Sequence, residues 1–313
     1  FGAGNCVFFV DGVNPALRWN GSTFTEIKST NGGTSISDAG GPQALDKPSV
    51  VAVFKDHVFL SGDADFPSTV AHSAPSACID WTSASGAGQL SLGVQVVQIK
   101  MFRDALFIFG KTAISKALPD PTAGFLVQPV TREIGCVARD SVIEIGGDLV
   151  FLAQDGFRPV AGTSRIGDVE LETISKAIQK TLTSLLYIYD LDTLVSVMVR
   201  SKSQFRIFVG DDSALPEESY GILGALRGAD QQFGWEFGEL IGIRASCATS
   251  AYVAHEELVL HGDYSGKVYR QEVGDNFDGK EIFSVYETPY LDFGDTEVRK
   301  VIHHISTFLR AEG

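Results

Sequence analysis

The chain has few of the residues that mark several common protein classes. It contains four cysteines in 313 residues, and they lie far apart: Cys6, Cys78, Cys136 and Cys247. No two of them form a CxxC pair, whereas zinc sites need paired spacing and a disulfide-stabilised domain needs denser cysteine. We therefore expect free thiols in a reducing compartment. No apolar run approaches the ~20 residues that a bilayer-spanning helix requires, so no membrane-spanning segment is expected.

Basic residues are also scarce, with 25 Lys and Arg against 39 Asp and Glu and a formal net charge of −14. Nucleic-acid binding over a broad surface needs clustered Lys and Arg, so this chain is not expected to grip phosphates. The acidity has two interpretations. It keeps the protein in solution, or it lets nucleic acid pass without adhering, because like charges repel.

Motifs for bond chemistry are absent from the sequence. It has no GxSxG elbow, no HExxH and no GxxxxGK[ST] loop. The adjacent His303 and His304 lie in "VRKVIHHISTF", which we interpret as an alternating strand, so their rings would point to opposite faces and would not share a metal. Acidic turns such as Gly62–Phe66 and Gly274–Gly279 do not match the twelve-residue calcium loop. We expect no enzyme activity, no catalytic residue, no cofactor and no metal.

The residues that are abundant favour strands joined by tight turns, since the chain has 33 Gly and 21 Phe but 2 Met. One short phrase occurs three times, as "KDHVFLSG" (Lys55–Gly62), "RDALFIFG" (Arg103–Gly110) and "GDLVFLAQDG" (Gly147–Gly156). The step is 48 residues from Asp56 to Asp104 and 44 residues from Asp104 to Asp148. Periods of ~40–50 residues with four strands each are typical of β-propeller blades.

Each phrase follows one alternating strand and precedes another, so it predicts a hairpin turn and the strand after it. We assign the repeated Asp to the turn and the repeated Phe to the seam between blades; these residues are Asp56, Phe59, Asp104, Phe107, Asp148 and Phe151. Weaker copies occur at Asn5–Gly21, Leu194–Asp212 and Ser250–Glu272, the last with a turn expected at His255–Glu256. The prediction is an all-β, β-propeller-like fold of about six four-stranded blades.

One segment has a helical pattern instead, because apolar residues recur every three or four positions at Leu171, Ile174, Ile178, Leu182 and Leu185. It predicts one inserted amphipathic helix at about 171–186, capped by Thr173 or Ser175, which either packs on the propeller rim or binds a partner. We place the propeller-like body at 1–281 and a strand-rich segment at 282–313. That segment either closes the propeller or leads to a further β domain, and both chain ends have the form of a fragment of a longer protein.

Two passages resemble tail proteins of short-tailed bacteriophages: Thr131–Val160, "TREIGCVARDSVIEIGGDLVFLAQDGFRPV", and His261–Phe308, from "HGDYSGKVYRQE" to "VIHHISTF". The family is that of the tail nozzle or tail tube proteins, also called packaged-DNA stabilisation proteins, and the likeness extends over most of the chain. It implies a propeller-like subunit of a hexameric ring, located in the virion tail and assembled in the cytoplasm of the host bacterium. It also implies a tail adaptor protein and tail fibres or a needle as partners, and a channel that retains packaged DNA and conducts it without sequence-specific binding.

Two hypotheses follow. The first is a virion structural protein that gates genome ejection, with Asn31–Pro48 and Gly210–Gly221 as candidate loops lining the channel. The alternative is a monomeric β-propeller that binds a carbohydrate or protein ligand on its top face, with Trp81, Trp235 and Tyr252 as candidates for a central aromatic pocket. The oligomeric state distinguishes the two.

Overall fold

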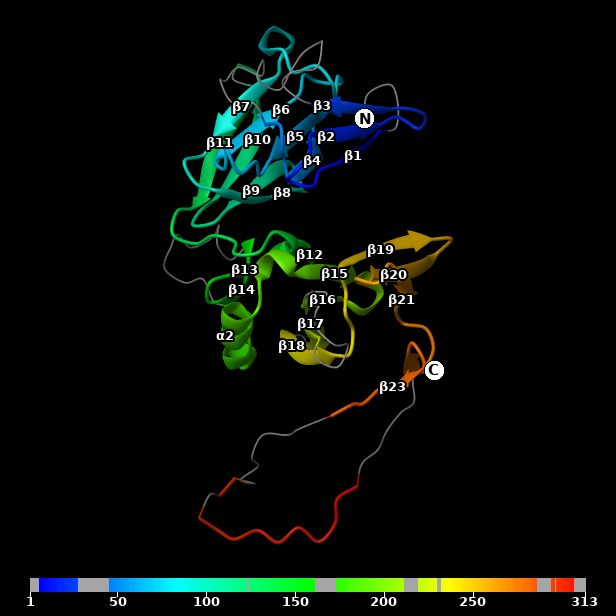
Figure 1. The fold of residues 1–313 in the computed structure, drawn as a ribbon. Coiled ribbons are helices and arrows are strands. Elements are labelled where there is room, and N and C mark those ends of the chain that lie inside the picture. Colours follow the sequence, from blue (N-terminus) through cyan, green and yellow to red (C-terminus); the bar gives the residue numbers. More distant parts are fainter. Residues whose placement is uncertain are drawn as a thin grey trace.

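The computed structural model describes residues 6–27, 45–122, 124–160, 173–210, 219–229, 232–285, 294–295 and 297–306. In these residues the chain forms a series of small antiparallel sheets, each built from strands that follow one another in sequence (Figure 1). Antiparallel neighbours can be joined by very short turns, so a Gly-rich chain of alternating strands folds into successive meanders. A meander of this kind is the unit of a propeller blade.

The first three sheets span the N-terminal half of the chain. Sheet 1 contains β1 (Val7–Phe9), β2 (Ala16–Trp19) and β3 (Phe24–Ile27). Sheet 2 contains β4 (Val50–Phe54), β5 (His57–Ser61), β6 (Thr69–His72) and β7 (Gly88–Ser91). Sheet 3 contains β8 (Val96–Phe102), β9 (Ala105–Gly110), β10 (Ile114–Asp120) and β11 (Gly124–Thr131).

The next three sheets follow in the same order. Sheet 4 contains β12 (Ile143–Ile145), β13 (Asp148–Ala153) and β14 (Gly156–Pro159). Sheet 5 contains β15 (Val195–Val199), β16 (Gln204–Val209), β17 (Tyr220–Ala229) and β18 (Gln232–Ile241). Sheet 6 contains β19 (Cys247–Val253), β20 (Glu256–Gly262) and β21 (Val268–Arg270), and a hairpin of β22 (Asn276–Phe277) and β23 (Lys280–Glu281) follows it.

Helical structure is minor in the residues that the structure describes. The helix α2 (Gln179–Ile188) lies between sheets 4 and 5. Short 3₁₀ helices occur at η2 (Ser83–Ser85), η3 (Arg139–Ser141), η4 (Lys176–Ile178), η5 (Leu191–Thr193) and η6 (Arg200–Lys202). No helix in the part of the chain that the structure describes is long and apolar enough to cross a bilayer.

In the described ranges the core consists of five clusters of buried side chains, and each cluster lies between two consecutive sheets. Ala16 and Ile27 of sheet 1 meet Val58 and Leu60 of sheet 2. The same arrangement continues with Phe59 and Leu106 between sheets 2 and 3, Phe109 and Phe151 between sheets 3 and 4, Phe157 and Phe205 between sheets 4 and 5, and Phe208 and Val259 between sheets 5 and 6. A single sheet cannot bury both of its faces, and stacking it on its neighbours does so.

The first strands of consecutive sheets lie side by side, with β4 beside β8, β12 beside β15 and β15 beside β19. Between sheets 3 and 4, η3 contacts β8. The sheets therefore follow one another around a common line of inner strands, which is the arrangement of propeller blades. In the described residues the chain is all-β and propeller-like, with the short helix α2 inserted between sheets, as the sequence predicts. Sheets 2, 3 and 5 have the expected four strands, whereas sheets 1, 4 and 6 have three within the described ranges.

The helix begins later than predicted, at Gln179 and not near 171. Leu182 and Leu185 are buried against sheets 4 and 5, so the apolar stripe packs on the body. Ser175, a candidate cap in the sequence, accepts a hydrogen bond at Oγ from the backbone N–H of Phe157 at 3.0 Å. Because this bond ties Ser175 to sheet 4, it does not cap the helix. Leu171 is outside the described residues.

The segment after Glu281 also differs from the expectation. Strands were predicted for 282–313, but residues 282–285, 294–295 and 297–306 have no regular structure. Figure 1 shows this part extending away from the sheets. Its apolar side chains are exposed, for example Phe283 at 90% and Ile305 at 77%. Without a neighbouring strand the backbone groups have no ladder to join, and an isolated strand is not stable in water.

Candidate binding edge

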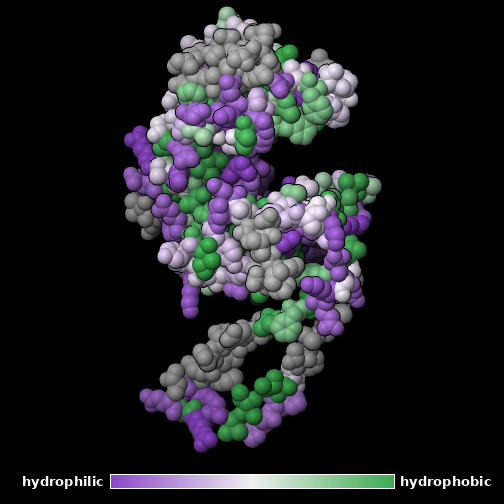
Figure 2. All heavy atoms as spheres, in the orientation of Figure 1, coloured by the Kyte–Doolittle hydropathy of each residue, from purple (hydrophilic) through white to green (hydrophobic). Residues whose placement is uncertain are grey.

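The series of sheets is open at one side. Each of the five core clusters joins consecutive sheets, and no cluster of the described residues joins sheet 6 to sheet 1. Figure 1 places sheets 1 and 6 on the same side of the molecule, and Figure 2 shows the surface hollowed between them. The two end sheets therefore each have one face without a packed sheet against it.

The uncovered face of sheet 1 is aromatic. The strand register aligns Val7, Trp19 and Phe24 in one row. Side chains alternate along a strand, so Phe9 shares this face with Val7, while Phe8 and Ala16 point to sheet 2. The ring of Phe24 lies 6.2 Å from the rings of both Phe9 and Trp19. We call Val7, Phe9, Trp19 and Phe24 the aromatic face.

Solvent reaches every residue of the aromatic face, with exposed fractions of 45% for Val7, 48% for Phe9, 37% for Trp19 and 64% for Phe24. Contiguous exposed apolar side chains mark interaction sites more often than scattered ones do. Aromatic residues also dominate the energetic centres of protein interfaces. This face has the chemistry of a docking surface.

Carboxylates lie beside the aromatic face. Asp11, in the turn between β1 and β2, accepts hydrogen bonds from the N–H groups of Asn14 at 2.7 Å and Val13 at 2.8 Å. The bond from the Asn14 backbone is the main reason that the pKa of Asp11 lies below its usual value. Glu26 is exposed on β3, two residues after Phe24 and thus on the same side. An ionised group near exposed rings favours a partner that is both apolar and cationic.

The uncovered face of sheet 6 is aliphatic. Val259 and Ala248 point to sheet 5, so the neighbouring residues Leu258 and Leu260 point away from it. Val253 and Val268, at the ends of β19 and β21, are 55% and 72% exposed. Glu256 and Arg270 on this sheet form an ion pair with each other, which leaves the face with balanced charge.

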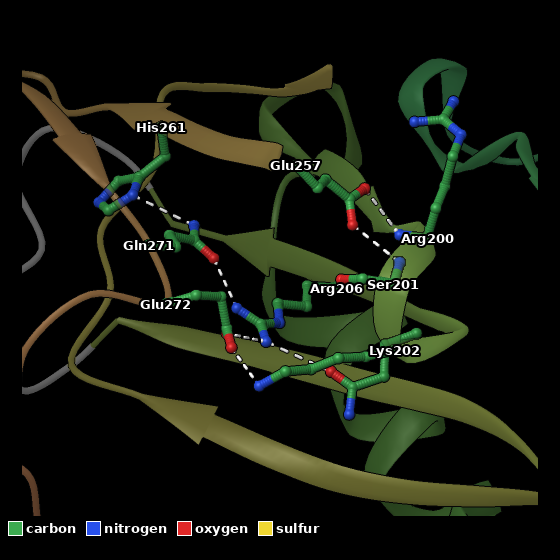
Figure 3. Close-up of polar contacts among 9 residues, drawn as sticks. Arg200, Ser201, Lys202, Arg206, Glu257, His261, Gln271 and Glu272 are labelled. Atoms are coloured by element: carbon green, nitrogen blue, oxygen red, sulfur yellow. Dashed lines mark hydrogen bonds and ion pairs between the residues drawn. The ribbon is translucent and has the colours of Figure 1, made fainter. Parts of the chain in front are cut away.

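A polar network fixes sheet 6 to sheet 5 (Figure 3). Arg206 on β16 is buried, and its guanidinium donates to Gln271 Oε1 at 2.8 Å and to a carboxylate oxygen of Glu272. Glu272 also forms an ion pair with Lys202 of η6. Gln271 in turn contacts His261 Nδ1 at 3.1 Å through its amide nitrogen. Residues from η6, β16, β20 and the chain after β21 are thereby connected.

A second part of the network joins η6 to β20. The backbone N–H groups of Arg200 and Ser201 each donate to the carboxylate of Glu257 at 2.8 Å. Burial opposes the charge on Glu257, but these hydrogen bonds outweigh it and lower its pKa. The pKa of Glu272 is lowered in the same way, because the bonds from Lys202 and Arg206 exceed the effect of burial. Both carboxylates are thus ionised at neutral pH: Glu257 holds backbone N–H groups of η6, and Glu272 holds the side chains of Lys202 and Arg206.

The repeated Asp residues lie at or beside hairpin turns. Lys55 and Asp56 form the two-residue turn between β4 and β5, with φ of 46° and 61°. Arg103 and Asp104 form the turn between β8 and β9. In the third phrase the turn is Gly146–Gly147, and Asp148 is the first residue of β13, paired with Ile145. The third phrase is therefore displaced by one residue relative to its turn.

That displacement changes the direction of the third Phe. Phe59 lies in the cluster between sheets 2 and 3, and the half-buried Phe107 packs on the cluster between sheets 3 and 4, so both face the following sheet. Phe151 belongs to the cluster between sheets 3 and 4, so it faces the preceding sheet. A shift of one residue moves a strand side chain to the opposite face.

Other candidate residues are dispersed. Trp81 is fully buried beside sheets 1 and 2, Trp235 packs on Phe205 and Phe237, and Tyr252 is 56% exposed on sheet 6. They form no common pocket. Most of Asn31–Pro48 and Gly210–Gly221, the candidate channel loops, lies outside the described residues. His303 and His304 are exposed.

A pocket with a volume of about 220 Å³ lies between sheets 3 and 4, and it contains two of the repeated Asp residues. Arg103, Asp104, Lys116 and Asp148 contribute two positive and two negative charges around Phe102 and Phe107. Arg103 donates from Nη2 to the carbonyl of Gly147 at 2.7 Å, which ties the turn of sheet 3 to that of sheet 4. No cluster of three or more His, Cys, Asp or Glu that could hold a metal occurs in the described ranges.

No protein-family model and no curated protein matches the chain. Several solved β-propeller structures are remotely similar. The N-terminal domain of Nup159 has 11% identity and a TM-score of 0.43, covering 90% of this chain and 76% of that one. Saccharomyces cerevisiae Sqt1 has 9% identity and a TM-score of 0.42, covering 85% and 78%. Kluyveromyces lactis Hsv2 has 10% identity and a TM-score of 0.36, covering 76% and 73%.

Proposed function

We propose that this chain is a structural protein-binding module that acts by docking and assembly and performs no bond chemistry. The observation that carries the proposal is the aromatic face of sheet 1 at the open end of the sheet series. Apart from the aliphatic outer face of sheet 6, the other apolar faces in the series from sheet 1 to sheet 6 are covered by a neighbouring sheet. A protein partner bound on the aromatic face would cover it in the way that each sheet covers the apolar face of its neighbour.

Four titratable groups with shifted pKa values support this proposal, because each of them lies in a contact between two sheets. Burial lowers the pKa of His72 to about 4, and its ring lies among Phe59, Phe125 and His57 in the seam between sheets 2 and 3. Burial raises the pKa of the Cys136 thiol to about 11. Glu257 and Glu272 belong to the polar network. Each of these groups stabilises a seam between sheets.

A more specific candidate is a phage tail nozzle subunit, which would form a ring that retains and conducts packaged DNA. Two observations favour it: the resemblance of Thr131–Val160 and His261–Phe308 to that family, and the exposed apolar side chains after Glu281. A self-contained monomer would leave both those side chains and the aromatic face in water. The net charge of −14 suits a channel wall to which DNA does not adhere.

The first test is the mass of the full-length protein in solution by light scattering, with negative-stain imaging of any particles that contain it. A defined oligomer or a ring with a central hole supports the nozzle candidate. A stable monomer in solution that is absent from particles would rule that candidate out.

The docking role is tested separately with the double variant Trp19→Ser/Phe24→Ser. Its matched control is Tyr187→Ser, because Tyr187 is a 91% exposed aromatic residue on α2, away from the aromatic face. We expect the double variant to lose assembly or partner binding and the control to keep both. Equal behaviour of the double variant, the control and the native chain would refute docking through the aromatic face.

A further inference from the structure

The described part of the C-terminal segment is aliphatic and basic. From Val298 to Ala311 the sequence has no acidic residue, in a chain with a net charge of −14. Val298, Val301, Ile302 and Ile305 are 57–77% exposed. Between them stand Arg299, Lys300, His303 and His304. We call Val298–Ser306 the basic segment.

The basic segment and the aromatic face are chemically complementary. Cationic side chains are attracted to the faces of Trp and Phe rings, and Trp19 and Phe24 offer such rings in an exposed, stacked pair. Asp11 and Glu26 add negative charge beside the rings. Aliphatic side chains of the segment would bury their surface on Phe9 and Val7. The uncovered face of sheet 6 fits less well, because its exposed side chains Val253 and Val268 are aliphatic and offer no ring face to a cation.

The two surfaces lie at opposite ends of the molecule. Sheet 1 is at the upper end in Figure 1, and the basic segment lies beyond β23 at the lower end. Complementary surfaces at opposite ends of one chain join copies head to tail, and such contacts generate closed rings or open chains. We propose that the aromatic face of sheet 1 binds the basic segment of a second copy of this chain. The proposal rests on the docking function given above and names its partner.

The contact is tested first with a synthetic peptide of residues 298–306. Trp19 reports binding by its fluorescence, since Trp81 is fully buried and the half-buried Trp235 can be removed as Trp235→Phe. We expect a saturable blue shift of the emission as the peptide covers Trp19. The peptide with Val301→Asp and Ile302→Asp should bind about tenfold more weakly or worse, because two aliphatic side chains lose their burial. No shift with the native peptide would overturn the proposal.

The head-to-tail arrangement is tested in the full chain by mixing two variants. Phe24→Ser alters the aromatic face and keeps the segment, while Val301→Asp/Ile302→Asp alters the segment and keeps the face. We expect each variant alone to be a monomer by light scattering and the equimolar mixture to form a dimer that does not grow further. The native chain should form larger species.

The remaining outcomes are also distinct. Peptide binding by a native chain that stays monomeric at all concentrations would mean that a chain binds its own segment, which overturns the second copy as the partner. Loss of partner binding in Trp19→Ser/Phe24→Ser without any peptide binding would leave the docking function intact and reject the basic segment as the occupant.

Discussion

Arg206→Met tests whether the polar network holds sheet 6 on the body. The Arg206 side chain is 9% exposed and donates to Gln271 and Glu272, both of which follow β21. Methionine keeps an unbranched apolar stem that reaches about as far as the Arg206 Nε, and it removes all the donors. Gln271 and Gln204 then each lose this donor at Oε1, and among the described residues Glu272 retains Lys202. The change therefore acts on the connection between sheets 5 and 6.

The expected loss follows from the burial of the pair. Removing one partner of a fully buried ion pair costs about 3–5 kcal/mol. The Glu272 side chain is 30% exposed and keeps Lys202, so solvent and the second cation reduce the penalty. In addition, the Nε of Arg206 has no hydrogen-bond partner among the described residues, and its removal returns a little free energy. We expect a loss of about 2 kcal/mol, which is below that range.

Hydrogen exchange resolved by residue is the assay. Amides of β19, β20 and β21 should exchange about 30-fold faster if local opening becomes easier by about 2 kcal/mol, while sheets 2 and 3 keep their rates. Arg227→Met is the control, because its Nε lies 3.8 Å from Glu236 Oε2 and both side chains are exposed; it should change stability by less than about 0.5 kcal/mol. A uniform change across all sheets, or no change in sheet 6, would refute the role of the network.

Two further predictions concern the seam between sheets 2 and 3. Burial lowers the pKa of His72 to about 4, so the folded protein keeps this side chain neutral down to about that pH. In the unfolded chain the same side chain takes up a proton below about pH 6.5. The contribution of His72 to the free energy of unfolding is then fully present above pH 6.5, and it declines by about 2–3 kcal/mol as pH falls toward 4. Urea titrations of His72→Phe should lack this decline. An unchanged pH profile in this variant would contradict the assignment. Phe59→Ala should lower the free energy of unfolding by about 3–5 kcal/mol, because Phe59 is fully buried. Phe107 is half-buried at the equivalent position of the next sheet, so Phe107→Ala should lower it by about half as much. Equal losses in urea unfolding would show that the two seams are packed alike.

The sequence predicts the sheet series well because two local signals agree. Phrases with Asp56 and Asp104 combine a turn former with an alternating apolar strand, and both form two-residue hairpins. The copy at Ser250–Glu272 also forms a hairpin, although its turn is Ala254–His255 and Glu256 already belongs to β20. Six sheets follow from this repetition. The number of strands in each sheet does not, because a short outer strand leaves a weaker pattern than a buried one.

The aromatic face could not be predicted, and the reason is the symmetry of a strand. Alternation in "CVFFV" and "ALRW" shows that Phe9 and Trp19 differ in direction from Phe8 and Arg18. It does not show which set faces the core, because both sets contain large apolar residues. Only the neighbouring sheet decides this, and in the structure Phe8 packs against sheet 2. The polar network was missed for a related reason, since Arg206 and Glu272 are 66 residues apart and carry no local signal.

The seams differ in chemistry along the series, and this difference has a consequence for assembly. The seams from sheet 1 to sheet 5 are dominated by large buried apolar side chains, whereas the seam between sheets 5 and 6 combines a small apolar cluster with the ion pairs of Glu272 and the bonds to Glu257. Apolar packing is insensitive to pH, but the two carboxylates have lowered pKa values, so their contribution is present above the usual carboxylate pKa and is lost as pH falls through the lower folded values. Sheet 6 therefore loses part of its polar attachment to sheet 5 in acid, at a pH below the range in which His72 acts on the seam between sheets 2 and 3. Sheet 6 also precedes the basic segment, so the sheet nearest this side of the proposed intermolecular contact is held by polar bonds that depend on pH. The aromatic face at the other end belongs to sheet 1, which is held by apolar packing.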